Sequence, residues 1–242
     1  MAVPEAAQGI TAVVVTYNPD PEQLARLCQA VQPQVEHVVL VDNGSSAETL
    51  AALQALVEGP SSALTLLAQG ENRGIGAAQN AGIAMARQHG SRYVLLLDHD
   101  SIPEADMVAT LRAAIEDQPA GSPPVAADGP RYADARQTTN PSPFVQLEGF
   151  KRVRCECQHA GQLIEVEHLI ASGSLIPMAV LDAVGDMDER LFIDYVDIEW
   201  CLRAAHAGYR MLGVCDARMQ HELGDTPIRF MGKHLPAHSP LR

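Results

Sequence analysis

The sequence predicts an α/β fold, with a mostly parallel central sheet flanked by helices and a small antiparallel portion in the second half of the chain. Apolar runs such as "ITAVVVTY" (10–17) and "YVLLLD" (93–98) do not alternate with polar residues. Unalternating runs of this length are typical of strands buried on both faces. Each run is followed by a short loop and a segment of helical periodicity, and this β-α rhythm predicts parallel strands.

Four β-α units are expected in the first 114 residues. The first helix has Leu24, Leu27 and Val31 on one face and ends at Pro33. The third helix is opened by glycines and closed by Gly90. The expected strands are residues 10–17, 37–42, 63–69 and 93–98, and the expected helices begin near residues 21, 47 and 74.

The alternation of strands and helices ends after Ala114. Residues 117–143 are rich in Pro, Gly, Ala, Asp and Thr, which predicts an irregular segment. Two strands that could form a hairpin follow at 146–158 and 162–170, and they make up the antiparallel portion. Helices are expected at 177–185 and 196–208, with a short strand at 211–215.

Composition indicates one domain and excludes some partners. With 242 residues, 47% of them hydrophobic, the chain can bury one sizeable core. The 17 basic against 30 acidic side chains give a formal net charge of -13, which argues against a general nucleic-acid binder. An anionic ligand must therefore be held by a local device such as a helix N-terminus, an arginine or a metal ion.

The cysteines predict neither a disulfide framework nor a zinc ribbon, because the five are scattered and form no C-x-x-C pair. Cys155 and Cys157 are interpreted as strand residues rather than a ligand pair. A reduced, cytoplasmic setting follows. The N-terminus resembles no signal peptide, and no window reaches the 18 to 20 apolar residues of a membrane span, so any membrane contact would be peripheral.

Polar residues accumulate where the first strands end. They are Thr16-Tyr17-Asn18, Asp42-Asn43, Asn72-Arg73-Gly74 and Asp98-His99-Asp100. Ligands of open parallel sheets bind outside the carboxyl ends of the strands. Ordinary turn formation is the alternative, and it explains Asn43-Gly44 and Asn18-Pro19 better than it explains Arg73 or the two acids.

The pair Asp98 and Asp100 predicts a divalent cation site. Residues i and i+2 of an extended strand point the same way, so the two carboxylates would aim at one point. Such oxygen ligands suit Mg²⁺ or Mn²⁺ that holds a diphosphate. The alternative is a pair of solvated acids that cap the next helix. His221, just beyond a predicted strand, is a further candidate, although a lone histidine is more often structural.

Two other segments suggest chemistry. Asp194 and Asp197 lie at or just before a helix N-terminus, where they could cap the helix or, if partly desolvated by Phe192, Tyr195 and Trp200, one of them could act as a base. The glycine-rich start of the helix at residue 74 imitates a dinucleotide fingerprint, but its third glycine is replaced by Gln79. A nicotinamide site is therefore a weak alternative.

Taken together, these motifs resemble an inverting family 2 glycosyltransferase of the GT-A fold. The matching stretches are "VVVTYN", "VVLVDNGSS", "ENRGIGAAQNAGIAMA", "YVLLLDHDS", "ASGSLIPMAVLDAVGDMDERLFIDYVDIEWCLRAAHAGYRM" and "QHELGD", in order over most of residues 10–225. "LLLDHDS" with "FIDYVDIEWCLR" is most similar to the bacterial rhamnosyltransferase branch, which builds surface polysaccharides from dTDP-L-rhamnose.

The resemblance implies a role for each group of residues. Asp197 would be the general base, although Val196 stands where many relatives carry a paired acid, and Asp194 is the residue that could compensate. The nucleotide-sugar would contact Thr16, Tyr17, Asn18, Asp42, Asn72, Arg73, Gly74 and Asp98. The metal would be held by Asp98, Asp100 and His221, and the acceptor side would include Ser172, Gly173, Asp194 and Trp200.

The resemblance also implies an activity and a division of the chain. The expected reaction is metal-dependent transfer from a dTDP-sugar, or alternatively a UDP-sugar, to a saccharide or lipid-linked saccharide. Residues of about 10–114 would form the nucleotide-binding half, and about 115–225 the acceptor and catalytic half. Residues 226–242 form a tail; the chain is short for this branch, so we expect a truncation or a domain of a longer protein. A non-catalytic sugar-nucleotide binding module and an NAD(P)-dependent dehydrogenase are the alternatives.

Overall fold

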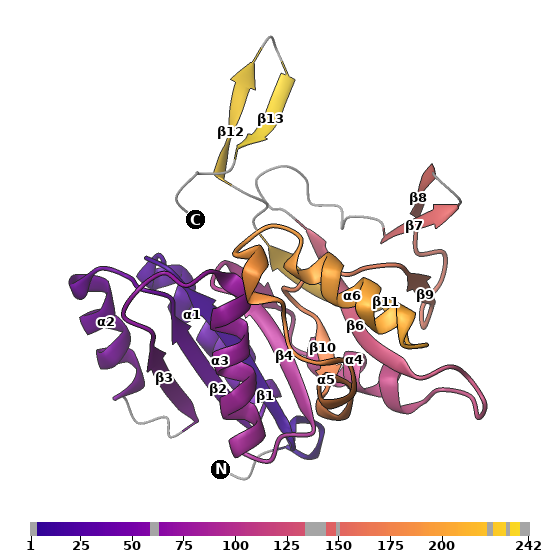
Figure 1. The fold of residues 1–242 in the computed structure, drawn as a ribbon, viewed down its shortest axis with the longest axis horizontal. Helices are drawn as coiled ribbons and strands as arrows, with labels where there is room; N and C mark the ends of the chain where they lie inside the picture. The colour runs from indigo at the N-terminus through magenta and orange to yellow at the C-terminus, as the bar shows by residue number, and fades with distance from the viewer. Residues whose placement is uncertain are drawn as a thin grey trace.

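A computed structural model of the chain describes residues 4–58, 63–133, 144–148, 151–221, 225–230 and 233–237. Its first half contains the expected parallel strands β1 (Ile10–Thr16), β2 (His37–Asp42), β3 (Leu64–Ala68) and β4 (Tyr93–Asp98) (Figure 1). They lie in the order β3-β2-β1-β4 and all pair in parallel. The predicted α/β class with a mostly parallel sheet is confirmed.

Helices cover both faces of this sheet. They are α1 (Pro21–Val31), α2 (Ala47–Val57), α3 (Ile75–Gln88) and α4 (Met107–Glu116). Alternate residues of β1 face opposite sides: Val13 packs with the α3 side chain Ile83, and Val14 packs with the α1 side chain Leu24. Burial of both faces explains the unalternating apolar strands.

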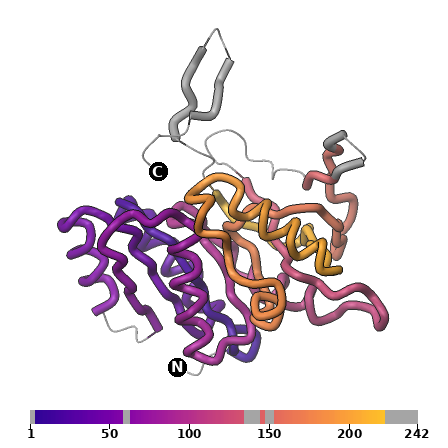
Figure 2. Tube along the Cα trace, in the orientation of Figure 1, coloured from indigo at the N-terminus to yellow at the C-terminus, as the bar shows by residue number. Residues whose placement is uncertain are grey.

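The sheet continues beyond β4 through the second half of the chain, so both halves share one sheet. Its full order is β3-β2-β1-β4-β10-β6-β11-β5, with β9 paired to β11. The tube in Figure 2 shows the early strands on one side and the later elements on the other. The remaining elements are η1 (Glu5–Ala7), η2 (Gln32–Gln34), β5 (Ser101–Pro103), β6 (Val125–Ala133), β7 (Phe144–Glu148), β8 (Lys151–Cys155), β9 (Leu163–Val166), β10 (Leu175–Pro177), α5 (Met178–Val184), η3 (Glu189–Leu191), α6 (Val196–His206), β11 (Arg210–His221), β12 (Asp225–Phe230) and β13 (Lys233–Ala237).

Three predictions for the second half are wrong. The segments 146–158 and 162–170 do not pair as a hairpin, because β7 pairs with β8 and β9 pairs with β11. The segment 117–143 is not irregular throughout, because β6 is an inner strand between β10 and β11; residues 134–143 lie outside the described part of the chain. The strand expected at 211–215 is β11, which has 12 residues. The Pro- and Gly-rich composition predicted irregular structure, but residues 125–130 are all buried in the sheet, so tertiary packing overrides local preference.

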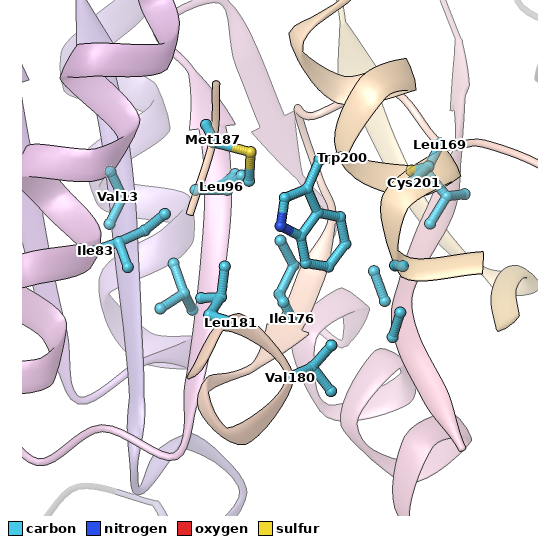
Figure 3. Packing of buried hydrophobic residues seen from close by; sticks show 14 of the residues in the cluster. Val13, Ile83, Leu96, Leu169, Ile176, Val180, Leu181, Met187, Trp200 and Cys201 are labelled. Atoms are coloured by element: carbon cyan, nitrogen blue, oxygen red, sulfur yellow. The ribbon is translucent and has the colours of Figure 1, made fainter. Parts of the chain in front are cut away.

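Trp200 of α6 belongs to the core, not to the surface of a ligand site. It is 2% exposed, and its Nε1 donates a hydrogen bond to the carbonyl of Gly185 at 2.9 Å. Figure 3 shows it in the packed interior beside Ile176, with Val180 and Leu181 nearby. The side chain therefore anchors α6 to the sheet.

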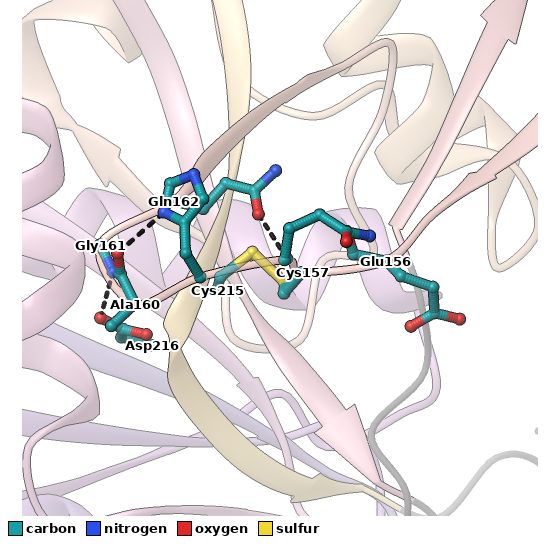
Figure 4. The surroundings of a disulfide bond; sticks show 9 residues. Glu156, Cys157, Ala160, Gly161, Gln162, Cys215 and Asp216 are labelled. Carbon is teal, nitrogen blue, oxygen red and sulfur yellow. Dashed lines mark hydrogen bonds between the residues drawn. A yellow bond between two sulfur atoms is a disulfide. The ribbon is translucent and has the colours of Figure 1, made fainter.

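The expectation that the cysteines form no disulfide is wrong for one pair. Cys157 and Cys215 are joined by a disulfide across 58 positions of sequence (Figure 4). Spacing could not reveal this pair, because it depends on the antiparallel pairing of β9 with β11, in which Leu163 lies opposite Val214. Cys28, Cys155 and Cys201 are free thiols. In the described part of the chain, no helix is long and apolar enough to cross a membrane.

Asp128 is an ionisable group in the middle of the sheet. It lies in β6, it is 0% exposed, and neither carboxylate oxygen has a hydrogen-bond partner among the described residues. Burial raises the pKa of this carboxyl well above its ordinary value of 3.8. The folded protein therefore retains a proton that the unfolded chain releases.

We predict that this proton makes wild-type stability fall as pH rises from 4 towards the raised pKa of Asp128. The slope is at most about 1.4 kcal/mol per pH unit from this group. Asp128→Asn removes this pH-dependent loss of stability. The free energy of unfolding of the variant minus that of wild type should therefore increase with pH when both are measured in urea at pH 4 to 8. Asp117→Asn, on an exposed side chain, is the control. A difference independent of pH would contradict the prediction.

Candidate active site

A cavity of about 590 Å³ opens at the carboxyl edge of β1 and β4, between the N-terminal ends of α3 and α6. Parallel α/β sheets usually bind ligands at this edge, and the volume suits a small organic ligand. It is lined by Val15, Tyr17, Asn43, Asn72, Gly74, Ile75, Gln79, Asp98, His99, Asp100, Ile170, Ala171, Ser172, Phe192, Ile193, Asp194, Val196, Asp197 and His221. None of these residues is Lys or Arg, whereas four are Asp.

Three candidate metal ligands converge on this cavity. Asp98, Asp100 and His221 each offer a ligand atom, and these atoms lie within 4.8 Å of one another. Asp98 is the last residue of β4, and Asp100 lies in a turn rather than in the extended strand assumed from sequence. His221 reaches them because it ends β11, where it pairs with Ser101 of β5.

The electrostatics of the two acids differ. Burial raises the pKa of Asp98, and the negative charge of Asp100 adds to this. Burial also acts to raise the pKa of Asp100, but the neighbouring imidazoles, His221 first, outweigh it and leave the pKa lowered. Asp100 Oδ1 lies 3.3 Å from His221 Nδ1. A divalent cation would relieve the repulsion between the acids.

The chemistry of this ligand set fits such a cation. Carboxylate oxygens with one imidazole suit Mg²⁺ or Mn²⁺. Asp100 Oδ1 is buried and forms an ion pair with His221 but no hydrogen bond of good geometry among the described residues, so it remains available to a cation.

Two serines support the ligand cluster, and sequence reasoning missed this arrangement. Ser101 Oγ lies 2.7 Å from His221 Nδ1 and 2.6 Å from Ser172 Oγ. Ser172 Oγ in turn accepts a hydrogen bond from the backbone N–H of Asp98 at 2.9 Å. Metal-ligating histidines generally use their second ring nitrogen to bond a neighbour of this kind. Ser172, expected on the acceptor side, thus lies against the ligand cluster.

Amide side chains form the part of the cavity wall that follows β2 and β3. Asn43 Nδ2 donates to Asn72 Oδ1 at 3.0 Å, and Asn43 Oδ1 accepts from the backbone N–H of Arg73 at 2.9 Å. Tyr17 and Gly74 complete this part. Asn43 had been explained as a turn former, yet it holds the two loops together.

Several predicted binding residues do not line the cavity. Thr16 is fully buried, and its hydroxyl is directed to the carbonyl of Val41. Asn18 Oδ1 accepts from the backbone N–H of Ser46. Arg73 and Gly173 do not line the cavity, and neither does Asp42, whose Oδ1 is buried with no hydrogen-bond partner among the described residues.

The start of α6 brings Asp197 to the cavity. Its Oδ1 accepts a hydrogen bond from the backbone N–H of Ile198 at 2.8 Å. Asp194 lies in the preceding loop, in which Phe192 and Tyr195 have φ of 58° and 67°. Few non-glycine residues adopt such values, and they concentrate at functional sites.

This loop is fixed to the start of α3. The carbonyl of Phe192 accepts a hydrogen bond from the backbone N–H of Ile75 at 2.6 Å. Gly74, with φ of +86°, permits this approach, because a β-carbon there would lie 2.5 Å from the same carbonyl oxygen. Val196, at the position where an acid was expected, is 2% exposed and packs into the core.

The fold and the acidic cavity define an α/β protein with a candidate cation site at the carboxyl edge of its sheet, and comparison with known sequences identifies the family. Residues 11–163 match the sequence profile of "Glycosyl transferase family 2". The chain is 32% identical over 234 residues to the dTDP-rhamnosyl transferase RfbF of Shigella flexneri. This match covers 96% of this chain and 75% of that protein. It is 27% identical over 229 residues to the galactofuranosyltransferase GlfT1 of Mycobacterium tuberculosis, covering 92% and 73%. The chain belongs to glycosyltransferase family 2, and it is a glycosyltransferase.

Solved structures show the same fold at low sequence identity. GalNAc-T7, determined with UDP, GalNAc and Mn²⁺, matches with a TM-score of 0.72 and 16% identity, over 92% of this chain and 44% of that one. The mannosyltransferase PcManGT of Pyrobaculum calidifontis, in complex with GDP-Man and Mn²⁺, matches with a TM-score of 0.62 and 17% identity. That match covers 89% of this chain and 57% of that one. This chain therefore spans about half the length of these two. The GT-A fold predicted from sequence is confirmed.

We predict that Ser101→Ala weakens Mn²⁺ binding about tenfold to 100-fold, because His221 loses the hydroxyl that holds its Nδ1. Isothermal titration of Mn²⁺ in the presence of dTDP measures this. Ser91→Ala is a matched control, since Ser91 Oγ forms a buried hydroxyl pair with Thr11 Oγ1 at 2.7 Å and neither residue lines the cavity. Equal Mn²⁺ affinity in the two variants would contradict the supporting role of Ser101.

Proposed function

We propose that this glycosyltransferase is inverting and metal-dependent, and that it transfers L-rhamnose from dTDP-L-rhamnose to a saccharide or lipid-linked saccharide in cell-surface polysaccharide synthesis. The observation that carries the proposal is the convergence of Asp98, Asp100, His221 and Asp197 on one cavity. The similarity to a dTDP-rhamnosyl transferase supports the choice of donor.

The three clustered ligands would hold Mg²⁺ or Mn²⁺ against the diphosphate of the donor. The bound ion would supply the positive charge that stabilises the leaving diphosphate, because the cavity-lining residues that the structure describes include no Lys or Arg. Ser101 and Ser172 keep His221 and the end of β4 in register around that site.

Asp197 is proposed as the general base. Its Oδ1 is occupied by the backbone N–H of Ile198, which leaves Oδ2 to accept the proton of the acceptor hydroxyl. The acceptor oxygen forms a bond to the anomeric carbon while the bond from that carbon to the diphosphate breaks. Because attack and departure occur on opposite faces of the sugar, the configuration inverts.

The donor nucleotide is proposed to bind beside Tyr17, Asn43 and Asn72. These side chains line the cavity at the ends of β1, β2 and β3. Asp42 would support this pocket from behind, because its Oδ2 accepts hydrogen bonds from the backbone N–H groups of Gly44 and Ser45 in the loop after β2. Thr16, Asn18, Arg73 and Gly74 would then shape this pocket through the backbone.

The acceptor is proposed to approach over the loop that precedes α6. Phe192, Ile193 and Asp194 line the cavity there and are exposed. A cytoplasmic location, with peripheral contact to the inner face of the membrane, remains part of the proposal. The Cys157–Cys215 disulfide counts against it, because such bonds are rare in reducing compartments.

A thermal-shift panel tests the donor. It combines dTDP-rhamnose, UDP- and GDP-sugars and NAD(P) with Mn²⁺, Mg²⁺ or EDTA. A ligand at about 100 times its dissociation constant stabilises a protein by about 2.7 kcal/mol, so we expect metal-dependent stabilisation that is largest for dTDP-rhamnose. Stabilisation only by NAD(P), unaffected by EDTA, would contradict the proposal.

Replacing the base separates chemistry from binding. Asp197→Asn should lower the rate of transfer from dTDP-rhamnose about 100-fold to 10,000-fold while the dissociation constant of the donor stays unchanged. Asp194→Asn, also on the cavity wall, is the matched control and should keep most of the activity. Loss of transfer in the Asp194 variant alone would reassign the base to Asp194. Wild-type binding without any transfer would favour a non-catalytic module.

A further inference from the structure

A buried glutamine on the cavity wall takes no part in the steps described above. Gln79, in the second turn of α3, lines the cavity although it is only 3% exposed. Its Oε1 is buried and accepts no hydrogen bond from any residue that the structure describes. A buried amide oxygen without a donor is costly, and the position of Gln79 on the cavity wall would let a bound ligand supply that donor.

The packing of α3 places this oxygen close to the reaction centre. Gly82 lies against β1, since a β-carbon there would be 2.2 Å from Val13 Cγ1. Residues three apart share a helix face, and residues two apart share a strand face. Gln79 therefore lies over Val15, nearer the carboxyl edge of the sheet than the contact of Gly82 with Val13. Val15 in turn pairs directly with Asp98.

Four lining residues at the ends of β1 and β4 and at the start of α6, namely Val15, Asp98, Val196 and Asp197, offer Gln79 no side-chain donor when both acids are ionised. Val15 and Val196 carry apolar side chains. Asp98 bound to a cation and Asp197 acting as a base are both ionised, and ionised carboxylates accept hydrogen bonds but donate none. The nucleotide is proposed to bind farther along the edge, at Tyr17, Asn43 and Asn72. The ligand group that reaches Gln79 is therefore a hydroxyl between the metal ligands and the base.

We propose that Gln79 determines specificity for the donor sugar, with its side-chain amide oxygen accepting a hydrogen bond from a ring hydroxyl of that sugar. This inference rests on the proposed function, because it requires a nucleotide-sugar in the cavity. It assigns recognition of the sugar, as distinct from the nucleotide, to α3.

The test measures how much the sugar adds to binding. Dissociation constants of dTDP and dTDP-rhamnose, both with Mn²⁺, are determined for wild type and for Gln79→Met, which keeps the length of the side chain and removes its acceptor. We expect the dissociation constant of dTDP to stay unchanged and that of dTDP-rhamnose to rise. The ratio of the dTDP constant to the dTDP-rhamnose constant should therefore fall about fivefold to tenfold. The melting temperature without ligand should not fall, because the variant removes an unpartnered polar group.

Gln69→Met is the matched control. Gln69 follows β3, its Oε1 is likewise buried without a partner among the described residues, and it does not line the cavity. Its variant should bind both ligands as wild type does. Gln79→Leu provides a second test if the Met variant unfolds.

The outcomes separate this inference from the proposed function. An unchanged ratio in the Gln79 variants, or equal weakening of dTDP and dTDP-rhamnose, would overturn the role of Gln79 alone. A wild-type protein that binds neither ligand with Mn²⁺ would overturn the proposed function, and the role of Gln79 with it.

Discussion

The antiparallel pairing of β11 with β5 determines where the chemistry of this protein can occur. Ser101 and His221, 120 positions apart in sequence, are partners in that pairing. The pairing sets the imidazole beside the acids that end β4, and it brings Ser101 Oγ within hydrogen-bond distance of His221. Without it, Asp98 and Asp100 would form an ordinary acidic turn. The site thus depends on the edge of the sheet formed by the second half of the chain.

Electrostatics favour a cation as the bridge between this acidic protein and the anionic donor proposed for it. The chain carries a formal charge of -13, and the described residues of the cavity wall include four aspartates but no Lys or Arg. Such a cavity repels a diphosphate unless a cation intervenes. The buried acids gain from the same cation, because it offsets the desolvation that raises the pKa of Asp98. Ligand binding and relief of internal repulsion therefore favour the same ion.

Local sequence signals identified some features well. The first four strands and three helices were predictable because apolar runs, glycines and prolines recur at short range. Asp98 and Asp100 lie at the end of one of those strands, and Asp197 lies at the start of the helix expected at 196–208. Features that depend on distant contacts were not predictable. The composition of β6 is typical of irregular structure, and the Cys157–Cys215 disulfide depends on a strand pairing. Trp200 was expected at the site, and only its packing shows that it belongs to the core. Ser101 and Gln79 belong to the stretches "LLLDHDS" and "GIGAAQNAG", but nothing else in the sequence indicated a role for them at the site.

The most direct test of the metal site is anomalous diffraction from crystals grown with Mn²⁺ and dTDP. The account predicts one strong peak about 2.0–2.6 Å from an oxygen of Asp98 or Asp100 and from a ring nitrogen of His221, with the diphosphate on its open side. Bound dTDP without a peak at these residues, or a peak elsewhere in the cavity, would contradict the claim that the pairing of β5 with β11 builds the catalytic centre.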